Sequence, residues 1–115
     1  MTTLDFGTIR LEALGYDSSK LTVSEPEFVM IALESMLASS FDNHTTHQEQ
    51  RGFNRLMGLF DSQFPLLELS AEDHGTLINL WKSRRYPIQA GPNRRLIAAL
   101  DRIIVADDFK DEAHA

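Results

Sequence analysis

Residues 24–41 read SEPEFVMIALESMLASSF, and this stretch decides the fold. It begins with a capping box, in which Ser24 is the residue before the first helical turn and Glu27 occupies the third helical position. Pro26 falls in the first turn, where its missing N–H leaves no hydrogen bond unmade. The residues that follow are apolar on nearly every side, as in a helix surrounded by its neighbours. We therefore expect residues 25–41 to form the central helix.

Three further helices are predicted downstream, and each shows a capping residue or an initial proline followed by an apolar stripe. They are residues 47–62 after the Thr46–Glu49 capping box, residues 71–85 after Ser70, and a last helix opened by Pro92. The apolar stripes of all four helices supply the expected core. Its main residues are Phe28, Ile31, Leu33, Leu37, Phe53, Leu56, Phe60, Leu77, Trp81, Leu100 and Ile103.

The segment before the central helix has two interpretations. Residues 5–14 (DFGTIRLEAL) are predicted as a short helix ended by Gly15, which suits the left-handed position after a helix. The rival interpretation is a strand over residues 6–11, because apolar and polar residues alternate there. Residues 66–69 lie between two predicted helices and are expected to form an extended apolar connector. The pattern predicts an all-α protein, either a compact four- to five-helix bundle or an orthogonal helical array.

Length and composition are those of one domain. The chain has 115 residues, of which 43% are hydrophobic and 24% are charged. We expect residues 1–106 to form a single helical domain and residues 107–115 to form an acidic, frayed tail. We find no signal-peptide pattern, no stretch long enough to span a membrane and no cysteine, and we therefore expect a cytoplasmic protein.

The sequence lacks the common signatures of catalysis. It has no cysteine and no P-loop, G-x-S-x-G, G-x-G-x-x-G or HExxH motif. The candidate metal ligands are His44 and His47, but this pair straddles a predicted helix start and has no third histidine nearby. We interpret the segment as a hydrated polar loop. The sequence therefore predicts a protein that is not an enzyme and that has no metal and no cofactor.

Charge is distributed unevenly along the chain. The net charge is −6, yet residues 82–102 contain six of the 11 lysines and arginines. If the two predicted helices of this region are antiparallel neighbours, their basic residues converge on one end of the fold. Arginine binds carboxylate and phosphate groups through two parallel hydrogen bonds, so such a cluster can bind a partner. The candidate partner-binding residues are Trp81, Lys82, Arg84, Arg85, Tyr86, Arg94 and Arg95.

The two arginine pairs of this region differ in the helix end that they occupy. Arg84 and Arg85 end a predicted helix, where positive charge complements the helix dipole. Arg94 and Arg95 lie at a predicted N-terminus, where the dipole disfavours cations. Arg102 follows Arg95 by seven residues and points the same way, off the apolar stripe. Surface charge without function is the simpler interpretation of both pairs, and it fits the second pair less well.

We predict that the chain is a small module, itself acidic, that binds another protein. We expect an inhibitor, an immunity protein or antitoxin, or an adaptor, which acts by occupying the surface of another protein. The alternative is a nucleic-acid-binding protein that uses the basic residues of segment 82–102. The connection between the arginine pairs is too long for a helix-turn-helix, and the overall acidity opposes non-specific DNA binding. Apolar residues at helix ends are compatible with a homodimer, and we expect no association with a membrane.

Overall fold

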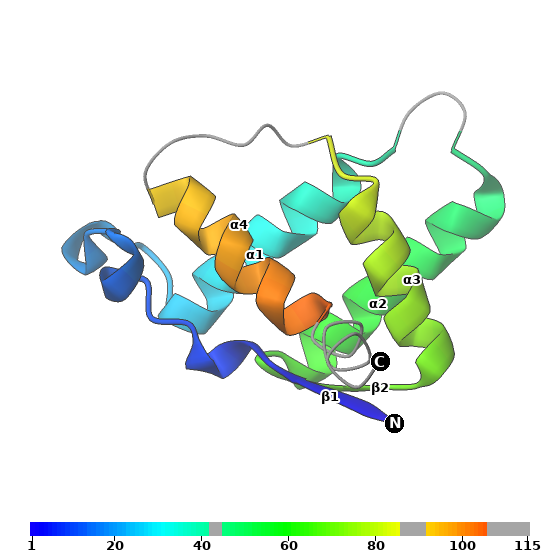
Figure 1. Ribbon diagram of the computed structural model, residues 1–115, viewed down its shortest axis with the longest axis horizontal. Helices are drawn as coiled ribbons and strands as arrows, with labels where there is room; N and C mark the ends of the chain where they lie inside the picture. Colours follow the sequence, from blue (N-terminus) through cyan, green and yellow to red (C-terminus); the bar gives the residue numbers. More distant parts are fainter. Residues whose placement is uncertain (42–44, 86–91, 106–115) are drawn as a thin grey trace, which may run out of the picture.

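The computed structural model describes residues 1–41, 45–85 and 92–105 (Figure 1). Within these ranges the chain has four α-helices and a two-stranded antiparallel sheet. The helices are α1 (Glu25–Ala38), α2 (His47–Gln63), α3 (Ala71–Lys82) and α4 (Pro92–Ile104). The strands are β1 (Thr2–Asp5) and β2 (Leu66–Leu69). The expected compact arrangement of four helices is confirmed, and none of these helices is long and apolar enough to cross a membrane.

The first three helices begin at the predicted caps. The side-chain oxygens of Ser24, Thr46 and Ser70 accept hydrogen bonds from the amides of Glu27, Glu49 and Asp73, respectively. Each bond satisfies one of the amides that a helix leaves unpaired at its N-terminus. Short polar side chains therefore set where these helices start.

Helices α1 and α3 each end three residues before the predicted boundary. After α1, the Ser39 and Ser40 hydroxyls donate to the carbonyl oxygens of Met36 and Leu37. The same two carbonyl oxygens also accept the backbone amides three residues later, so the hydroxyls reinforce a tightened last turn. At the end of α3 the Arg84 guanidinium likewise donates to the Trp81 carbonyl oxygen.

The predicted helix over residues 5–14 is wrong. The chain instead forms β1 and then three short 3-10 turns, at Phe6–Thr8, Glu12–Leu14 and Ser18–Lys20. The rival strand over residues 6–11 is also misplaced, because the strand ends at Asp5. Strand β1 forms because it pairs with β2, with Leu4 opposite Leu67. That partner strand lies more than 60 residues away in the sequence. Gly15 does adopt the left-handed conformation, with φ 97°, after a 3-10 turn.

The sheet closes the lower side of the helical layer in Figure 1. Leu4, Leu67 and Leu69 point inward and are buried, whereas the side chains between them face solvent. Leucines that alternate with exposed residues on two paired strands are the pattern of a sheet with one covered face. The expected extended connector over residues 66–69 is therefore a strand that covers the core with one side and pairs with the N-terminal strand.

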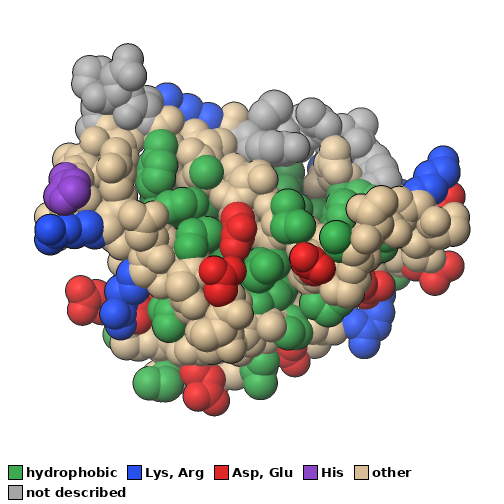
Figure 2. All heavy atoms as spheres, turned by 180° about the vertical axis from the view of Figure 1, so that it is seen from behind, with side chains coloured by type: hydrophobic (Ala, Val, Ile, Leu, Met, Phe, Trp, Pro, Cys, Tyr) green, Lys and Arg blue, Asp and Glu red, His purple; other side chains and the backbone are tan. Residues whose placement is uncertain are grey.

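Most of the predicted core is confirmed. Seven of its residues are fully buried, namely Leu33, Leu37, Leu56, Phe60, Leu77, Trp81 and Leu100. Three more, Phe28, Phe53 and Ile103, are partly buried at the edge of the core. Ile31 is the exception, because its side chain is 47% exposed. The expectation that neighbours surround the central helix on all sides is thus wrong, since the outer side of α1 faces solvent (Figure 2).

Candidate partner-binding surface

Trp81 and Arg84 form a stacked pair at the end of α3. Trp81 is fully buried, and its indole N–H donates to the Asp101 carboxylate of α4 at 2.8 Å. The Arg84 guanidinium carbon lies 4.0 Å from the centre of the Trp81 ring, and Nη1 donates to the Trp81 carbonyl oxygen at 2.7 Å. Arg84 therefore caps the C-terminus of α3 and covers the tryptophan. Of the residues predicted to bind a partner, these two also have a structural function.

The other basic residues at this helix end have contacts within the molecule as well. Lys82 and Arg85 are exposed, and each takes part in an interaction inside the chain. The Arg85 amide donates to the Ser39 hydroxyl at 3.0 Å, which ties the end of α3 to the end of α1. Tyr86 lies outside the described residues. The first arginine pair is therefore next to the C-terminus of α1.

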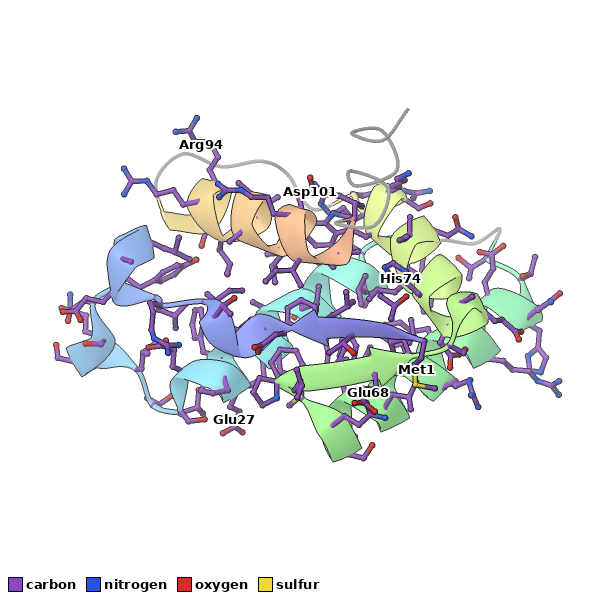
Figure 3. The ribbon with its side chains drawn as sticks, turned by 60° about the horizontal axis from the view of Figure 1, so that its bottom comes forward. Met1, Glu27, Glu68, His74, Arg94 and Asp101 are labelled. Carbon is purple, nitrogen blue, oxygen red and sulfur yellow. The ribbon has the colours of Figure 1, made fainter. Side chains whose placement is uncertain are left out.

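Helix α4 presents three arginines on its outer side. Arg94 and Arg95 are exposed in its first two turns, and Arg102 is exposed seven to eight residues later. Arg95 and Arg102 are in line along the helix, and Arg94 is turned by about 100° from Arg95, so the three share the outer half of the helix, which we call the α4 face. Figure 3 shows Arg94 projecting away from the body of the molecule. Among residues 1–41, 45–85 and 92–105, no hydrogen bond or ion pair holds any of these three guanidinium groups.

The structure does not bring the two arginine pairs together. Trp81 of α3 meets α4 near its C-terminal end, at Asp101. The first turn of α4 lies instead beside the N-terminal 3-10 turns, where the Tyr16 hydroxyl donates to Asn93 at 2.7 Å (Figure 1). The antiparallel packing on which the expected convergence depended is not formed by α3 and α4. The basic segment is thus divided between two regions of the surface.

A groove of ≈ 410 Å³ adjoins the α4 face and was not expected from the sequence. Its apolar lining comes from Ile9, Ala13 and Leu14 of the N-terminal segment and from Ala99 and Ile103 of α4. Exposed arginines, Arg10 and Arg102, line it from the two sides. We call this the N-terminal groove. Because the segment that forms one wall was predicted as a helix, no sequence pattern placed it against α4.

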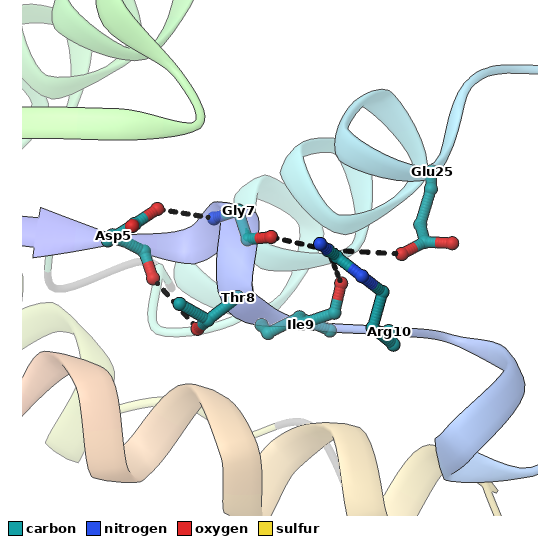
Figure 4. Close-up of polar contacts among 6 residues, drawn as sticks. All are labelled: Asp5, Gly7, Thr8, Ile9, Arg10 and Glu25. Atoms are coloured by element: carbon teal, nitrogen blue, oxygen red, sulfur yellow. Dashed lines mark hydrogen bonds and ion pairs between the residues drawn. The ribbon is translucent and has the colours of Figure 1, made fainter.

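The position of Arg10 in this groove is set by neighbouring polar groups. Its Nη1 donates to the Gly7 carbonyl oxygen and lies 3.8 Å from Glu25 Oε1 (Figure 4). The Asp5 carboxylate accepts from the Gly7 amide, which fixes the turn that presents this carbonyl. Arg10 keeps an exposed side chain in spite of these contacts. One wall of the groove is therefore held by a small polar network at the start of the chain.

Another exposed arginine, Arg55, forms an ion pair inside the molecule. Its Nε and Nη2 donate to the two carboxylate oxygens of Asp73 at 2.8 and 3.1 Å. The hydrogen bond from Arg55 holds the pKa of the Asp73 carboxyl below its usual range, and the Ser70 hydroxyl lowers it further. This bidentate pair joins α2 to α3. Arg55 thus differs from the arginines of the α4 face, because an acid of the same chain is within reach of its guanidinium group.

The candidate metal ligands do not form a site within the structure. His47 is exposed at the start of α2, and His44 lies outside the described residues. In the ranges that the structure covers, no group of three or more histidine, aspartate or glutamate side chains could hold a metal ion. The proposed pair is therefore not supported by a third ligand from this part of the chain.

Two other predicted segments, the loop over residues 86–91 and the acidic tail over residues 107–115, also lie outside the described residues.

No known protein family matches this chain. No curated protein sequence and no solved structure matches it either. The candidate surface is defined by the residues of this chain alone. It comprises the α4 face and the N-terminal groove beside it.

Proposed function

We propose that this chain is a protein-binding module, of the inhibitor, immunity-protein, antitoxin or adaptor type, that occupies an acidic surface of another protein with its α4 face. The observation that supports this most directly is the set of exposed arginines, Arg94, Arg95 and Arg102, on one side of one helix. Arginine is enriched where proteins bind each other, and its planar group matches a carboxylate. The Arg55–Asp73 pair shows the bidentate contact that a partner's acid would complete at the α4 face.

The position of two of these arginines on the helix supports a partner. Arg94 and Arg95 lie near the N-terminus of α4, where the positive end of the dipole disfavours a cation by about 0.3–1 kcal/mol. Among the described residues nothing offsets that cost, because neither side chain meets an acid. A carboxylate from another protein would be attracted both by the guanidinium groups and by the helix end. Binding thus removes an unfavourable arrangement present in the free molecule.

The N-terminal groove favours a protein over a nucleic acid. Its aliphatic lining, which includes Ile9 and Leu14, can bury an apolar side chain, worth about 1.5–3 kcal/mol when burial is complete. Single-stranded nucleic acids are usually bound by aromatic platforms, and none of the described residues that line this groove is aromatic. The net charge of −6 also opposes a long phosphate chain. A protein segment with a carboxylate next to an aliphatic side chain matches both features.

The test is capture of a partner from native-source lysate with matched variants. Immobilised wild-type protein, the double variant Arg94→Glu with Arg95→Glu, and the single variants Arg94→Glu and Arg51→Glu are compared with and without nuclease. Arg51 is an exposed arginine of α2, so its reversal makes the same change in charge away from the α4 face. Circular dichroism first establishes that all variants keep their helices.

The proposal expects one protein to be retained in near-stoichiometric amount by the wild type and by Arg51→Glu. Retention should fall with Arg94→Glu and be lost with the double variant, and nuclease should have no effect. Equal capture by wild type and double variant would remove the α4 face from the binding site. Capture that disappears with nuclease, and elutes at moderate salt, would instead support the nucleic-acid alternative for these residues.

A further inference from the structure

The surface on the other side of the molecule from α4 is apolar at its centre. Ile31 of α1 is 47% exposed, and Met30 of α1 and Met57 of α2 are partly buried at the same helix pair. Figure 2 shows hydrophobic side chains spread across the middle of this side, with lysines and arginines towards the edges. In Figure 1, α1 lies behind α4 and α2 passes behind α3. An exposed apolar region with a polar rim is typical of a surface that binds another molecule.

Two carboxylates lie within this apolar region. Glu34 is one turn from both Met30 and Ile31 on α1, and Asp61 is one turn from Met57 on α2. Burial raises the pKa of the Glu34 carboxyl, and the nearby Asp61 charge raises it further. In the described part of the chain neither carboxylate has a hydrogen bond or an ion pair. The Asp61 charge therefore disfavours ionisation of the partly buried Glu34, and no cation among the described residues pairs with either acid.

We propose that this surface, the α1–α2 face (Met30, Ile31, Glu34, Met57 and Asp61), binds a basic amphipathic helix of a partner protein. A lysine or arginine of that helix lies between the two carboxylates, and its apolar side chains cover the isoleucine and the methionines. A cation at that point neutralises both acids at once and removes their repulsion. Methionine adapts its shape to an apolar helix, which is why such surfaces are common where amphipathic helices bind.

This inference does not rest on the proposed function of the α4 face. The two surfaces lie on opposite sides of the molecule and have opposite charge (Figures 1 and 2). One partner can therefore occupy each of them at the same time. A protein with both surfaces would join an acidic partner to a basic one, which is the function of an adaptor.

The probe is a fluorescein-labelled amphipathic helical peptide made only of leucine and lysine. Its affinity is measured by fluorescence anisotropy for the wild type and for the double variant Glu34→Gln with Asp61→Asn. The matched control, Glu12→Gln with Glu68→Gln, makes the same change in net charge at exposed acids on other elements. A scrambled peptide of the same composition, which cannot form an apolar face, is measured in parallel.

The proposal expects the Glu34→Gln and Asp61→Asn variant to bind the helical peptide about tenfold more weakly than the wild type. The Glu12→Gln and Glu68→Gln control should stay within about twofold of the wild type, because exposed charges far from the bound peptide are screened by salt and contribute little to its binding. Ile31→Ser should also weaken binding, without loss of helical circular dichroism, because this side chain is already half exposed. Arg94→Glu with Arg95→Glu should bind the peptide at least as well as the wild type.

Three results would overturn the proposal. Equal weakening in both acid-to-amide pairs would show that only net charge attracts the peptide. Equal affinity for the helical and scrambled peptides would show that binding does not require an apolar face on the peptide. Concentration-dependent dimerisation of the wild type that Ile31→Ser abolishes would show that a second copy of this chain covers the face. None of these results depends on the pull-down that tests the α4 face.

Discussion

The chain contains the dipeptide Arg-Arg twice, at residues 84–85 and 94–95, and the two copies have different surroundings. At the end of α3, the Arg84 side chain donates to the Trp81 carbonyl oxygen and lies on the ring of Trp81. At the start of α4, the second pair points outward and meets no internal acid among the described residues. A helix C-terminus offers carbonyl oxygens and a favourable dipole to a guanidinium group, and an N-terminus offers neither. The helix end therefore separates an arginine that stabilises the fold from arginines left available for a partner.

The largest expected effect is that of removing the surface on which Arg84 stacks. Trp81→Ala should lower the free energy of unfolding by about 3–5 kcal/mol, because a fully buried aromatic side chain leaves a cavity. Urea denaturation followed by far-ultraviolet circular dichroism measures the change. Trp81→Phe, which keeps most of the volume, is the matched control and should lose less. A loss below about 1 kcal/mol for Trp81→Ala would contradict the assignment of this end of α3 to the core.

The next effect concerns the acid that holds the tryptophan from the other side. Asp101→Ala leaves the buried indole N–H without its acceptor and should cost about 1–2 kcal/mol. Asp101→Asn retains an oxygen that can accept this bond and should cost less. Trp81 is the only tryptophan of the chain, so its fluorescence reports the environment of the ring directly. If the alanine and asparagine variants have equal stability, the hydrogen bond to Asp101 does not contribute.

A smaller effect is expected for Arg84 itself. Arg84→Ala removes the stacked cation and the bond to the Trp81 carbonyl oxygen, and should lower stability by about 1 kcal/mol. The tryptophan emission should shift to the red, because water then reaches the uncovered ring. Arg85→Ala is the control, since the hydrogen bond from Arg85 to the Ser39 hydroxyl is made by its backbone amide, which the substitution keeps. An unchanged emission maximum in Arg84→Ala would mean that the arginine does not cover the ring.

Local signals predicted most of the helical architecture. Caps at Ser24, Thr46 and Ser70 and the proline that opens α4 marked the helix starts correctly, because a helix start is determined by a few neighbouring residues. The predicted ends of α1 and α3 were each three residues too late, and both errors concern the carbonyl oxygens at a helix C-terminus. There, side chains add hydrogen bonds to carbonyl oxygens that already accept the amide three residues later, and composition alone does not show where this happens.

Non-local contacts were the part that the sequence did not reveal. Strand β1 exists because Leu4 lies opposite Leu67, and the pattern of residues 5–14 contains no sign of that partner. The same error hid the N-terminal groove, because one wall belongs to this segment. The candidate site was predicted only in part for a similar reason. Spacing placed Arg95 and Arg102 on one side of a helix. Their separation from Arg84 and Arg85 follows from the way α3 and α4 cross, which the sequence does not show.

The smallest expected effect tests the second arginine pair and has the opposite sign. Arg94→Glu with Arg95→Glu replaces cations by anions near the N-terminus of α4, which the helix dipole favours, and should raise the free energy of unfolding by about 0.5 kcal/mol. The same double variant should lose the partner in the capture experiment. Thermal unfolding at low salt measures the first change, and added salt should reduce it. A variant that is more stable and inactive would show that the arginines are kept for binding at the expense of stability. A destabilised variant would instead place them with Arg84, as part of the structure.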